Sequence, residues 1–220
     1  MILGGCFSIL KEKLMSEYLT VKENASDEFI EKRSRFIGYC RPVKTQDEAV
    51  EFINQIRSKH WDATHNVYAY ILSDGQIMRY SDDGEPQGTA GVPVLEVMKK
   101  SGIVDAVVVV TRYFGGIMLG AGGLVRAYSH GASIAIAAAG IIKMQLCCEC
   151  SVSCSYGRYG KVSSLIPEMG GVIDDSVFGQ DVDILFHIPE EALKKLNKEL
   201  ADATSGEVQA ASDSARYYEV

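Results

Sequence analysis

The fold is decided by the stretch from Ile103 to Ala139, which reads IVDAVVVVTRYFGGIMLGAGGLVRAYSHGASIAIAAA. Residues Ile103–Thr111 are almost continuously apolar and β-branched, which is typical of a strand that is buried on both faces. A glycine-rich segment follows, and the Ala- and Ile-rich residues Gly122–Ala139 predict a helix packed against the sheet. The stretch therefore predicts a central strand, a glycine loop and a buried helix in direct succession.

Hydrophobic periodicity also predicts the elements that precede this stretch. We expect strands at Glu17–Lys22 and Arg35–Val43, a helix at Thr45–His60, a hairpin of Asn66–Leu72 with Gln76–Tyr80, and a helix at Gly91–Ser101. In the first helix one face carries the apolar residues Ala49, Phe52, Ile53 and Ile56, and Thr45 is suited to the N-cap. Ser-Asp-Gly at residues 73–75 suits the hairpin turn, and Gly102 suits the end of the second helix.

The residues after Lys143 have a pattern of their own. The expected order is a strand at Met144–Cys154, a helix with Tyr159, Val162, Leu165 and Ile166 at helical spacing, strands at Gly171–Phe178 and Asp181–Ile188, a helix at Glu190–Ala201 and a strand from about Glu207. This βαββαβ order is that of the ferredoxin-like motif. We therefore predict an α+β protein with domains at residues 15–142 and 143–220, preceded by a disordered extension at residues 1–14.

Composition limits the classes to which the protein can belong. The 220 residues are 23% charged and 47% apolar, which is typical of a globular protein with a real core. The formal net charge of -7 argues against nonspecific nucleic-acid binding, so an RNA contact would need a local basic patch. There is no apolar run of about 18 residues and no recognisable targeting signal. We expect a cytoplasmic protein with no membrane partner.

Cysteines are concentrated in the segment LCCECSVSC, which holds four of the six. Cys147 and Cys150 form a CxxC pair, which is half of a common zinc site. Strand alternation places this pair on opposite faces, and it places Cys148, Cys150 and Cys154 together on one face. We therefore interpret these cysteines as core residues and predict no metal site.

The segment SDDGEPQGTAGVP, from Ser81 to Pro93, is rich in acids and turn residues. Asp82, Asp83 and Glu85 place three carboxylates within four residues. Such a loop could hold Mg²⁺ through oxygen ligands, or one carboxyl group with a raised pKa could act as an acid or a base. Asp-Gly and Glu-Pro are also ordinary turn dipeptides, so a solvated turn is the alternative.

The glycine-rich segment begins where the predicted central strand ends. Arg112, Tyr113 and Phe114 end the strand, and the glycines that lead into the helix are Gly115, Gly116, Gly120, Gly122 and Gly123. Free amides at a helix N-terminus favour an anion, so this arrangement is suited to phosphate. The segment has no GK[ST] and no complete GxGxxG. The structural alternative is that the glycines permit close helix–sheet packing and that Arg112 pairs with the acids of the preceding segment.

The same segment combines aromatic and basic residues in a way that suits single-stranded RNA. The residues that could stack on bases and pair with phosphates are Arg112, Tyr113, Phe114, Arg126 and Tyr128. His65 and His130 are candidate bases, but no Ser or Cys nucleophile is tied to either by spacing. We assign no catalytic residue and no cofactor.

Three segments carry a family resemblance. SDDGEPQGTAGVP, VVVVTRYFGGIMLGAGGLVRAY and DATH (residues 62–65) resemble the YigZ/IMPACT family, and the two-domain layout resembles its bacterial YigZ branch. The resemblance assigns the family motif to Asp82, Asp83, Gly84, Glu85, Pro86, Gly88, Thr89, Gly91, Pro93, Arg112, Tyr113, Gly115, Gly116, Gly120, Gly122, Gly123, Leu124 and Tyr128. Phe114 and Arg126 are mild departures, since relatives often have Tyr and Lys there. The implied folds are those of domain IV of elongation factor G, shared with a ribosomal protein and GHMP-type kinases, and of domain V of the same factor.

The resemblance implies binding and names no established reaction. Eukaryotic IMPACT proteins regulate translation under amino-acid starvation, partly through an extra N-terminal domain that has no counterpart in this sequence. The bacterial branch implies RNA or ribosome binding, with no DNA specificity. We therefore carry two hypotheses, an RNA- or ribosome-associated regulator of translation, and a protein for a phosphate-bearing small molecule or a metal-dependent hydrolase or transferase. The second would use the glycine loop with Asp82, Asp83, Glu85 and Thr89.

Overall fold

A computed structural model describes residues 15–72 and 76–220. They form two compact units, one of residues Tyr18–Lys143 and one of residues Met144–Val220 with the segment that ends at Glu17. In the described part, helices and antiparallel sheets make an α+β protein, as the sequence predicts. The helices there are each too short or too polar to span a lipid bilayer. The predicted hairpin turn at 73–75 and the predicted extension at 1–14 lie outside the described residues.

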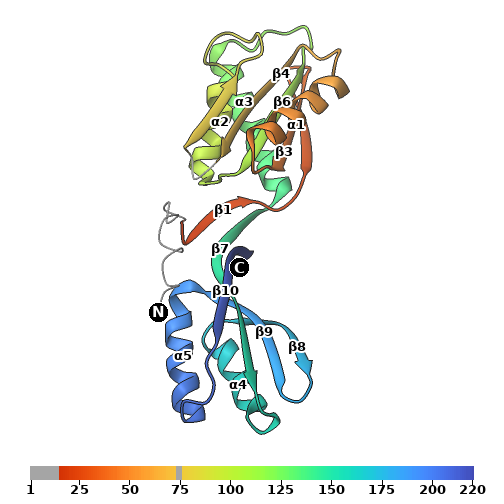
Figure 1. The fold of residues 1–220 in the computed structure, drawn as a ribbon. Coiled ribbons are helices and arrows are strands. Elements are labelled where there is room, and N and C mark those ends of the chain that lie inside the picture. The colour runs from red at the N-terminus through yellow and green to blue at the C-terminus, as the bar shows by residue number, and fades with distance from the viewer. Residues whose placement is uncertain (1–14, 73–75) are drawn as a thin grey trace, which may run out of the picture. The chain divides into compact units, whose positions relative to one another are not determined.

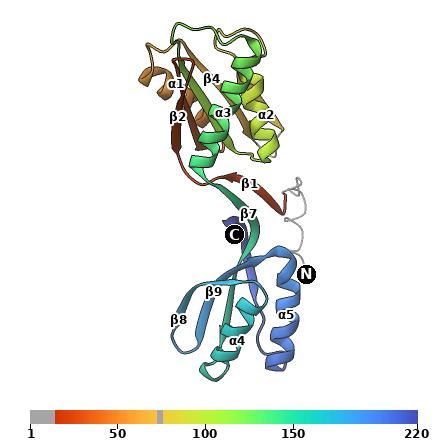
Figure 2. The same cartoon turned by 180° about the vertical axis from the view of Figure 1, so that it is seen from behind.

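The unit Tyr18–Lys143 is built on a sheet with strand order β2-β3-β6-β4-β5, in which all neighbours are antiparallel (Figures 1 and 2). Its elements are β1 (Glu17–Val21), β2 (Ala25–Glu31), β3 (Ser34–Pro42), α1 (Gln46–Lys59), β4 (His65–Leu72), β5 (Ile77–Ser81), α2 (Gly91–Ser101), β6 (Ala106–Tyr113) and α3 (Ala121–Ala139). Helices α2 and α3 cover one face of the sheet and α1 covers the other.

The central strand β6 is buried on both faces, as its apolar sequence predicts. Val108 and Val110 contribute to the core under α2 and α3, while Val107 and Val109 contribute to the core under α1. The strand begins at Ala106, three residues later than predicted, because Asp105 has a φ of 54° that interrupts the extended backbone.

Helix α1 shows how closely local sequence sets a helix boundary. The Thr45 hydroxyl accepts a hydrogen bond from the Glu48 amide at 3.2 Å, and the Glu48 carboxylate accepts one from the Thr45 amide at 3.3 Å. This capping box fixes the start of the helix at the residue that the sequence predicts. The four predicted apolar residues are all buried. Helix α2 ends at Gly102, whose φ is 68°, also as predicted.

Strand β2 was not predicted. It is an edge strand, its one partner among the described strands is β3, and most of its side chains are exposed. From β2, Ala25 and Phe29 pack against the hydrophobic core under α3. Because most of β2 is exposed, its sequence ASDEFIE does not alternate between apolar and polar residues. That alternation is the pattern that predicted other strands.

The second unit has the predicted βαββαβ order, in the elements β7 (Ile141–Cys154), α4 (Tyr156–Glu168), β8 (Val172–Phe178), β9 (Val182–Pro189), α5 (Glu190–Thr204) and β10 (Ala211–Glu219). Its antiparallel strands lie in the order β10-β7-β9-β8. Cys148, Cys150 and Cys154 lie in the core as free thiols, as predicted. The last strand begins at Ala211, later than the predicted start near Glu207, because the amides of Val208 and Ala210 donate to side chains of α5 instead of to a strand.

Packing of α3 on β3 depends on the absence of a side chain at Gly38. A Cβ there would lie 2.2 Å from the carbonyl oxygen of Gly131 in α3. We expect Gly38→Ala to lower the free energy of unfolding by about 1–3 kcal/mol, as overpacking does. Gly122→Ala is the control, because its added Cβ would meet nothing within 4 Å. Urea denaturation followed by circular dichroism measures both, and equal stability of the two variants would contradict this account of the packing.

Candidate functional site

The acidic segment forms the loop between β5 and α2, and its first carboxylate stabilises the start of α2. One oxygen of Asp82 accepts hydrogen bonds from the amides of Ala90 and Gly91 at 3.1 and 2.8 Å. The other oxygen accepts a hydrogen bond from the Gly88 amide at 2.9 Å. A carboxylate at a helix N-terminus satisfies free amides and complements the helix dipole, so Asp82 has a structural role.

Asp83 joins the loop to α1 and β4. Its carboxylate accepts hydrogen bonds from the Arg57 guanidinium at 2.8 Å and from the backbone amide of Asn66 at 2.6 Å. Its carbonyl oxygen lies 2.7 Å from Nδ1 of His65. The residue has a φ of 46°, a conformation that Asp tolerates better than most residues. These contacts hold the loop against two neighbouring elements.

Glu85 is buried, and its carboxylate is the hydrogen-bond acceptor for both Arg112 and Tyr128. Its Oε1 accepts hydrogen bonds from the Arg112 guanidinium at 2.5 Å and from the Tyr128 hydroxyl at 2.7 Å. The side chains of Glu85 and Arg112 are only 4% and 6% exposed. Burial and the Glu85 carboxylate raise the pKa of Tyr128, so its hydroxyl stays protonated and donates. The predicted pairing of Arg112 with the acidic segment is thus present, with Glu85 as the partner.

The sequence left two alternatives for the acidic segment, a metal or acid–base site and a solvated turn, and the buried Glu85 and Thr89 match a turn that is packed into the protein rather than solvated. Protein donors already bind the carboxylates of Asp82, Asp83 and Glu85. Thr89 donates its hydroxyl to the Pro86 carbonyl at 2.7 Å and closes the turn. Over residues 15–72 and 76–220, no group of three His, Cys, Asp or Glu side chains is placed to hold a metal ion. The geometry favours the structural role.

Arg112 also contacts two aromatic rings, Phe36 of β3 and Phe114 at the end of β6. The guanidinium lies 5.5 Å from the ring centre of Phe36 and 5.4 Å from that of Phe114. Such cation–π contacts orient the Phe114 ring, which is 48% exposed. The Phe114 amide donates a hydrogen bond to the Thr64 hydroxyl at 3.0 Å. Phe114 is therefore a surface residue with a fixed orientation.

Tyr113 belongs to a chain of hydrogen bonds on the α1 side of the sheet. The Tyr39 hydroxyl lies 2.6 Å from Nε2 of His60, and Nδ1 of His60 lies 2.8 Å from the Tyr113 hydroxyl. Tyr113 in turn donates to Asp62 at 3.1 Å. One direction satisfies every group: Tyr39 donates to His60, which donates to Tyr113. Burial lowers the pKa of His60, which agrees with the neutral ring that this direction requires.

The glycine loop between β6 and α3 lies against the tip of the β2–β3 hairpin. A Cβ at Gly115 would lie 2.0 Å from the Arg33 carbonyl, so only glycine permits this approach. The Gly115 amide donates a hydrogen bond to the Ser34 hydroxyl at 3.2 Å. Beyond this contact the loop is exposed, and Met118 is the most exposed apolar residue in it at 86%.

The hairpin tip contributes two basic residues that the sequence analysis missed. Lys32 and Arg33 have φ values of 44° and 67° and are exposed. A two-residue turn with both φ positive matches the twist of the flanking strands. The dipeptide itself gives little turn signal, and β2 was not predicted, so no hairpin was expected here.

A groove of about 470 Å³ lies between the β2 end of this hairpin and α3. Its charged lining consists of the cations Lys32 and Arg126 and the acid Glu31, beside Leu119 and Gly123. Helix α3 begins without a side-chain cap at Gly120, and an added Cβ at Gly122 would meet nothing within 4 Å. The first-turn amides therefore lie at an open surface. We call this region the hairpin–loop surface, and it consists of Lys32, Arg33, the segment Phe114–Gly123 and Arg126.

The predicted binding residues fall into three groups by exposure. Phe114, Gly116, Gly120, Gly122 and Arg126 are exposed, and Tyr113, Gly115 and Gly123 are partly buried. Arg112 and Tyr128 are buried around Glu85. The exposed group lies on the hairpin–loop surface, and the buried pair lies in the layer that supports it.

The Glu85–Arg112 pair makes a stability prediction. We expect Glu85→Gln to lower the free energy of unfolding by about 3–5 kcal/mol, because Arg112 would keep a buried charge without its counter-charge. Glu96→Gln removes the exposed pair with Lys99 and should cost less than about 1 kcal/mol. Guanidinium denaturation measures both, and the double variant Glu85→Leu/Arg112→Met should recover much of the loss. A cost for Glu85→Gln as small as that for Glu96→Gln would be evidence against a buried pair.

His60 makes a prediction about pH. Its native pKa is lowered from 6.5, so below about pH 6.5 the unfolded chain binds a proton that the native protein resists. Stability contributed by this group is therefore present above pH 6.5 and is lost as the pH falls towards the native value. We expect His60→Gln to reduce the loss of stability between pH 7 and pH 5, measured by urea denaturation at each pH. An unchanged pH dependence would show that His60 is not the group responsible.

Comparison with known proteins places both parts of the chain. Residues 32–136 match the Impact N-terminal domain, and residues 152–207 match a domain of unknown function (DUF1949). The chain is 38% identical over 194 residues to the IMPACT family member YvyE of Bacillus subtilis, covering 88% of this chain and 89% of that protein. It is 33% identical over 181 residues to the IMPACT family member YigZ of Escherichia coli, covering 81% and 89%. A crystal structure described as that of a hypothetical protein matches with a TM-score of 0.59 and 31% identity, over 91% of this chain and 99% of that one.

Proposed function

Because the chain belongs to the IMPACT family, we propose that it is a regulator of translation that contacts RNA or the ribosome through the hairpin–loop surface. The observation that carries the proposal is the pairing of Lys32 and Arg126 across the groove beside α3, with the exposed Arg33 next to Lys32 in the hairpin turn and Glu31 as the one acid in the groove lining. In the described residues none of these three cations forms a salt bridge with a carboxylate. A protein with a net charge of -7 thus has the local basic patch that RNA binding needs.

The side chains beside these cations suit an unpaired strand of RNA. Phe114 offers an exposed ring on which a base can stack, and its orientation is held by Arg112. Met118 and Ile117 add exposed apolar surface on the loop. The first-turn amides of α3 can donate to a phosphate oxygen. Stacking, cationic and amide contacts together favour a single strand over a duplex.

The proposal includes the likeness of the two units to domains IV and V of elongation factor G, a factor that works on the ribosome, and a cytoplasmic location. Antiparallel α+β units agree with that likeness. The hydrolase alternative has weaker support, because the acidic loop is bound by protein donors. Burial also raises the pKa of the Cys40 thiol to about 12, which makes it a poor nucleophile.

Charge reversal on the hairpin–loop surface tests the proposal. We expect Lys32→Glu/Arg126→Glu to weaken binding of a labelled single-stranded RNA of about 20 nucleotides at least tenfold at low salt. The plot of log binding constant against log salt concentration should become less steep. The magnitude of its slope should be smaller by about 1.4, because each of the two lost phosphate contacts contributes about 0.7 to it. Fluorescence anisotropy at several salt concentrations measures both quantities.

The matched control is Lys194→Glu/Lys195→Glu, which makes the same change of net charge on an exposed part of α5. It should bind RNA like the wild type. Equal weakening by both double variants would indicate only a general charge effect. Failure of the wild-type protein to bind RNA and to co-sediment with ribosomes at low salt would refute the proposed function.

A further inference from the structure

One end of the sheet in the unit Tyr18–Lys143 brings three segments side by side. Strand β6 ends there at Tyr113, which pairs with Arg35 of β3, just after the hairpin tip. On its other side β6 pairs with the start of β4, where His65 lies opposite Arg112. Because neighbouring strands lie about 5 Å apart, the chain that leaves the hairpin tip and the chain that enters β4 are separated by about 10 Å. The turn before β4 therefore lies at the same end of the sheet as the hairpin–loop surface.

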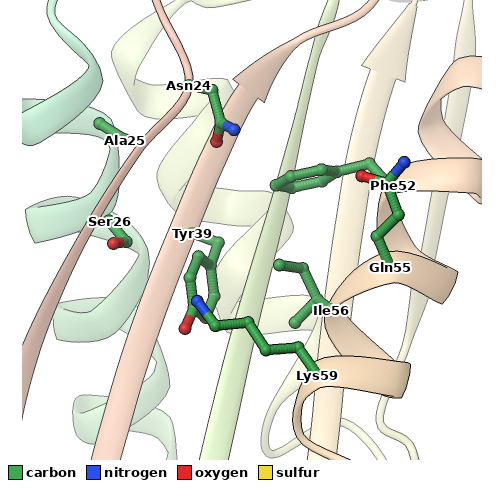
Figure 3. A pocket seen from close by; sticks show the side chains of 8 residues that line it. All are labelled: Asn24, Ala25, Ser26, Tyr39, Phe52, Gln55, Ile56 and Lys59. Carbon is green, nitrogen blue, oxygen red and sulfur yellow. The ribbon is translucent and has the colours of Figure 1, made fainter.

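This turn carries the one tryptophan of the chain, Trp61, and its side chain is 83% exposed. No other aromatic side chain in the described part of the chain is as exposed. Tryptophan is usually highly buried, because its ring is large and apolar. The rings between α1 and the sheet follow that rule, since Tyr39 and Phe52 are buried and Figure 3 shows Lys59 lying against Tyr39. Trp61 therefore presents a ring that the fold leaves uncovered.

Hydrogen bonds hold the turn against the end of β6 without using the Trp61 ring. The Thr64 amide donates to a carbonyl oxygen of β6 at 2.9 Å, and the Thr64 hydroxyl accepts a hydrogen bond from the Phe114 amide at 3.0 Å. The Asp62 carboxylate accepts a hydrogen bond from the Tyr113 hydroxyl at 3.1 Å. Three residues of chain span at most about 11 Å, so Trp61 lies close to Phe114. Two exposed rings are therefore carried by neighbouring segments whose backbones are fixed to each other.

We propose that Trp61 is a base-stacking residue of the RNA site, an inference that rests on the proposed function and extends its surface to the turn before β4. An unpaired strand would cross the end of the sheet with its phosphates at Lys32 and Arg126. Its bases would stack on Phe114 and then on Trp61. Every base offers a π-face, so such stacking adds affinity without sequence preference. An apolar protein partner would also cover the Trp61 ring, but it would not use the cations on the other side of Phe114.

Because the chain has one tryptophan, its fluorescence reports on this contact directly in the full-length protein. We expect the labelled single-stranded RNA to quench the Trp61 emission and to protect the ring from quenching by acrylamide. Both effects should saturate at the RNA concentrations at which fluorescence anisotropy detects binding. Binding by anisotropy with no change in emission or in acrylamide quenching would overturn the role of Trp61 and leave the proposed function standing.

Substitution of Trp61 separates stacking from charge. Trp61→Ala should weaken RNA binding about 5- to 150-fold, the effect of losing one stacked base. It should leave the salt dependence of binding unchanged, because no phosphate contact is lost. Trp61→Phe retains a ring and should keep most of the affinity. The matched control is Tyr80→Ala, which removes an exposed ring from β5, at the opposite edge of the sheet from β2, and should bind like the wild type.

The remaining outcomes distinguish this inference from the proposed function. Equal weakening by Trp61→Ala and Tyr80→Ala, or a loss of affinity in Trp61→Phe as large as in Trp61→Ala, would overturn stacking at this position. The melting temperature of Trp61→Ala should equal that of the wild type, because the side chain is exposed, and a lower value would assign the ring to the fold instead. Absence of RNA binding by the wild-type protein would refute the proposed function and this inference with it.

Discussion

One oxygen of Glu85 accepts hydrogen bonds from Arg112 of β6 and from Tyr128 of α3, and it lies 3.7 Å from Nε2 of His65 in β4. Four segments far apart in the sequence therefore meet at a single buried carboxylate. Apolar packing alone would tolerate small shifts of a helix along a sheet. A buried charge tolerates none, because a displaced Arg112 or Glu85 would be left without its partner. This interaction sets the positions of the acidic loop and α3 relative to the central strand.

The exposed surface follows from that buried arrangement by a short series of contacts. Arg112 contacts the rings of both Phe36 and Phe114, so it helps to orient the first residue after β6. Gly115 then allows the Arg33 carbonyl to approach, which brings the hairpin tip against the loop. Lys32 thereby lies at the groove beside the first turn of α3, and Arg33 follows it in the hairpin turn. The buried and exposed motif residues thus have different roles in one structure, since the first group supports the second.

Local sequence was sufficient for elements with a strong apolar pattern, and it failed where the pattern was weak. The capping box of α1 and the valine run of β6 predicted their elements closely. Strand β2 has exposed polar residues, so neither it nor the basic hairpin tip could be recognised. The hydrogen-bond partners of the acidic residues could not be predicted from local sequence either. Asp82 binds the amide of Gly91, nine residues later, and Glu85 binds Arg112 from another strand, contacts that only the fold brings together.

The end of β6 is held by side chains from both sides of the sheet. On the α3 side Arg112 pairs with Glu85, and on the α1 side the hydrogen bond between Tyr39 and His60 continues to Tyr113, the residue that precedes Phe114. The orientations of the Tyr39 and Tyr113 hydroxyls therefore depend on the same neutral imidazole. A change at His60 affects both tyrosines, whereas a change at Lys32 affects the hairpin–loop surface alone. This difference follows from position, because Lys32 is exposed and His60 is buried at the end of α1.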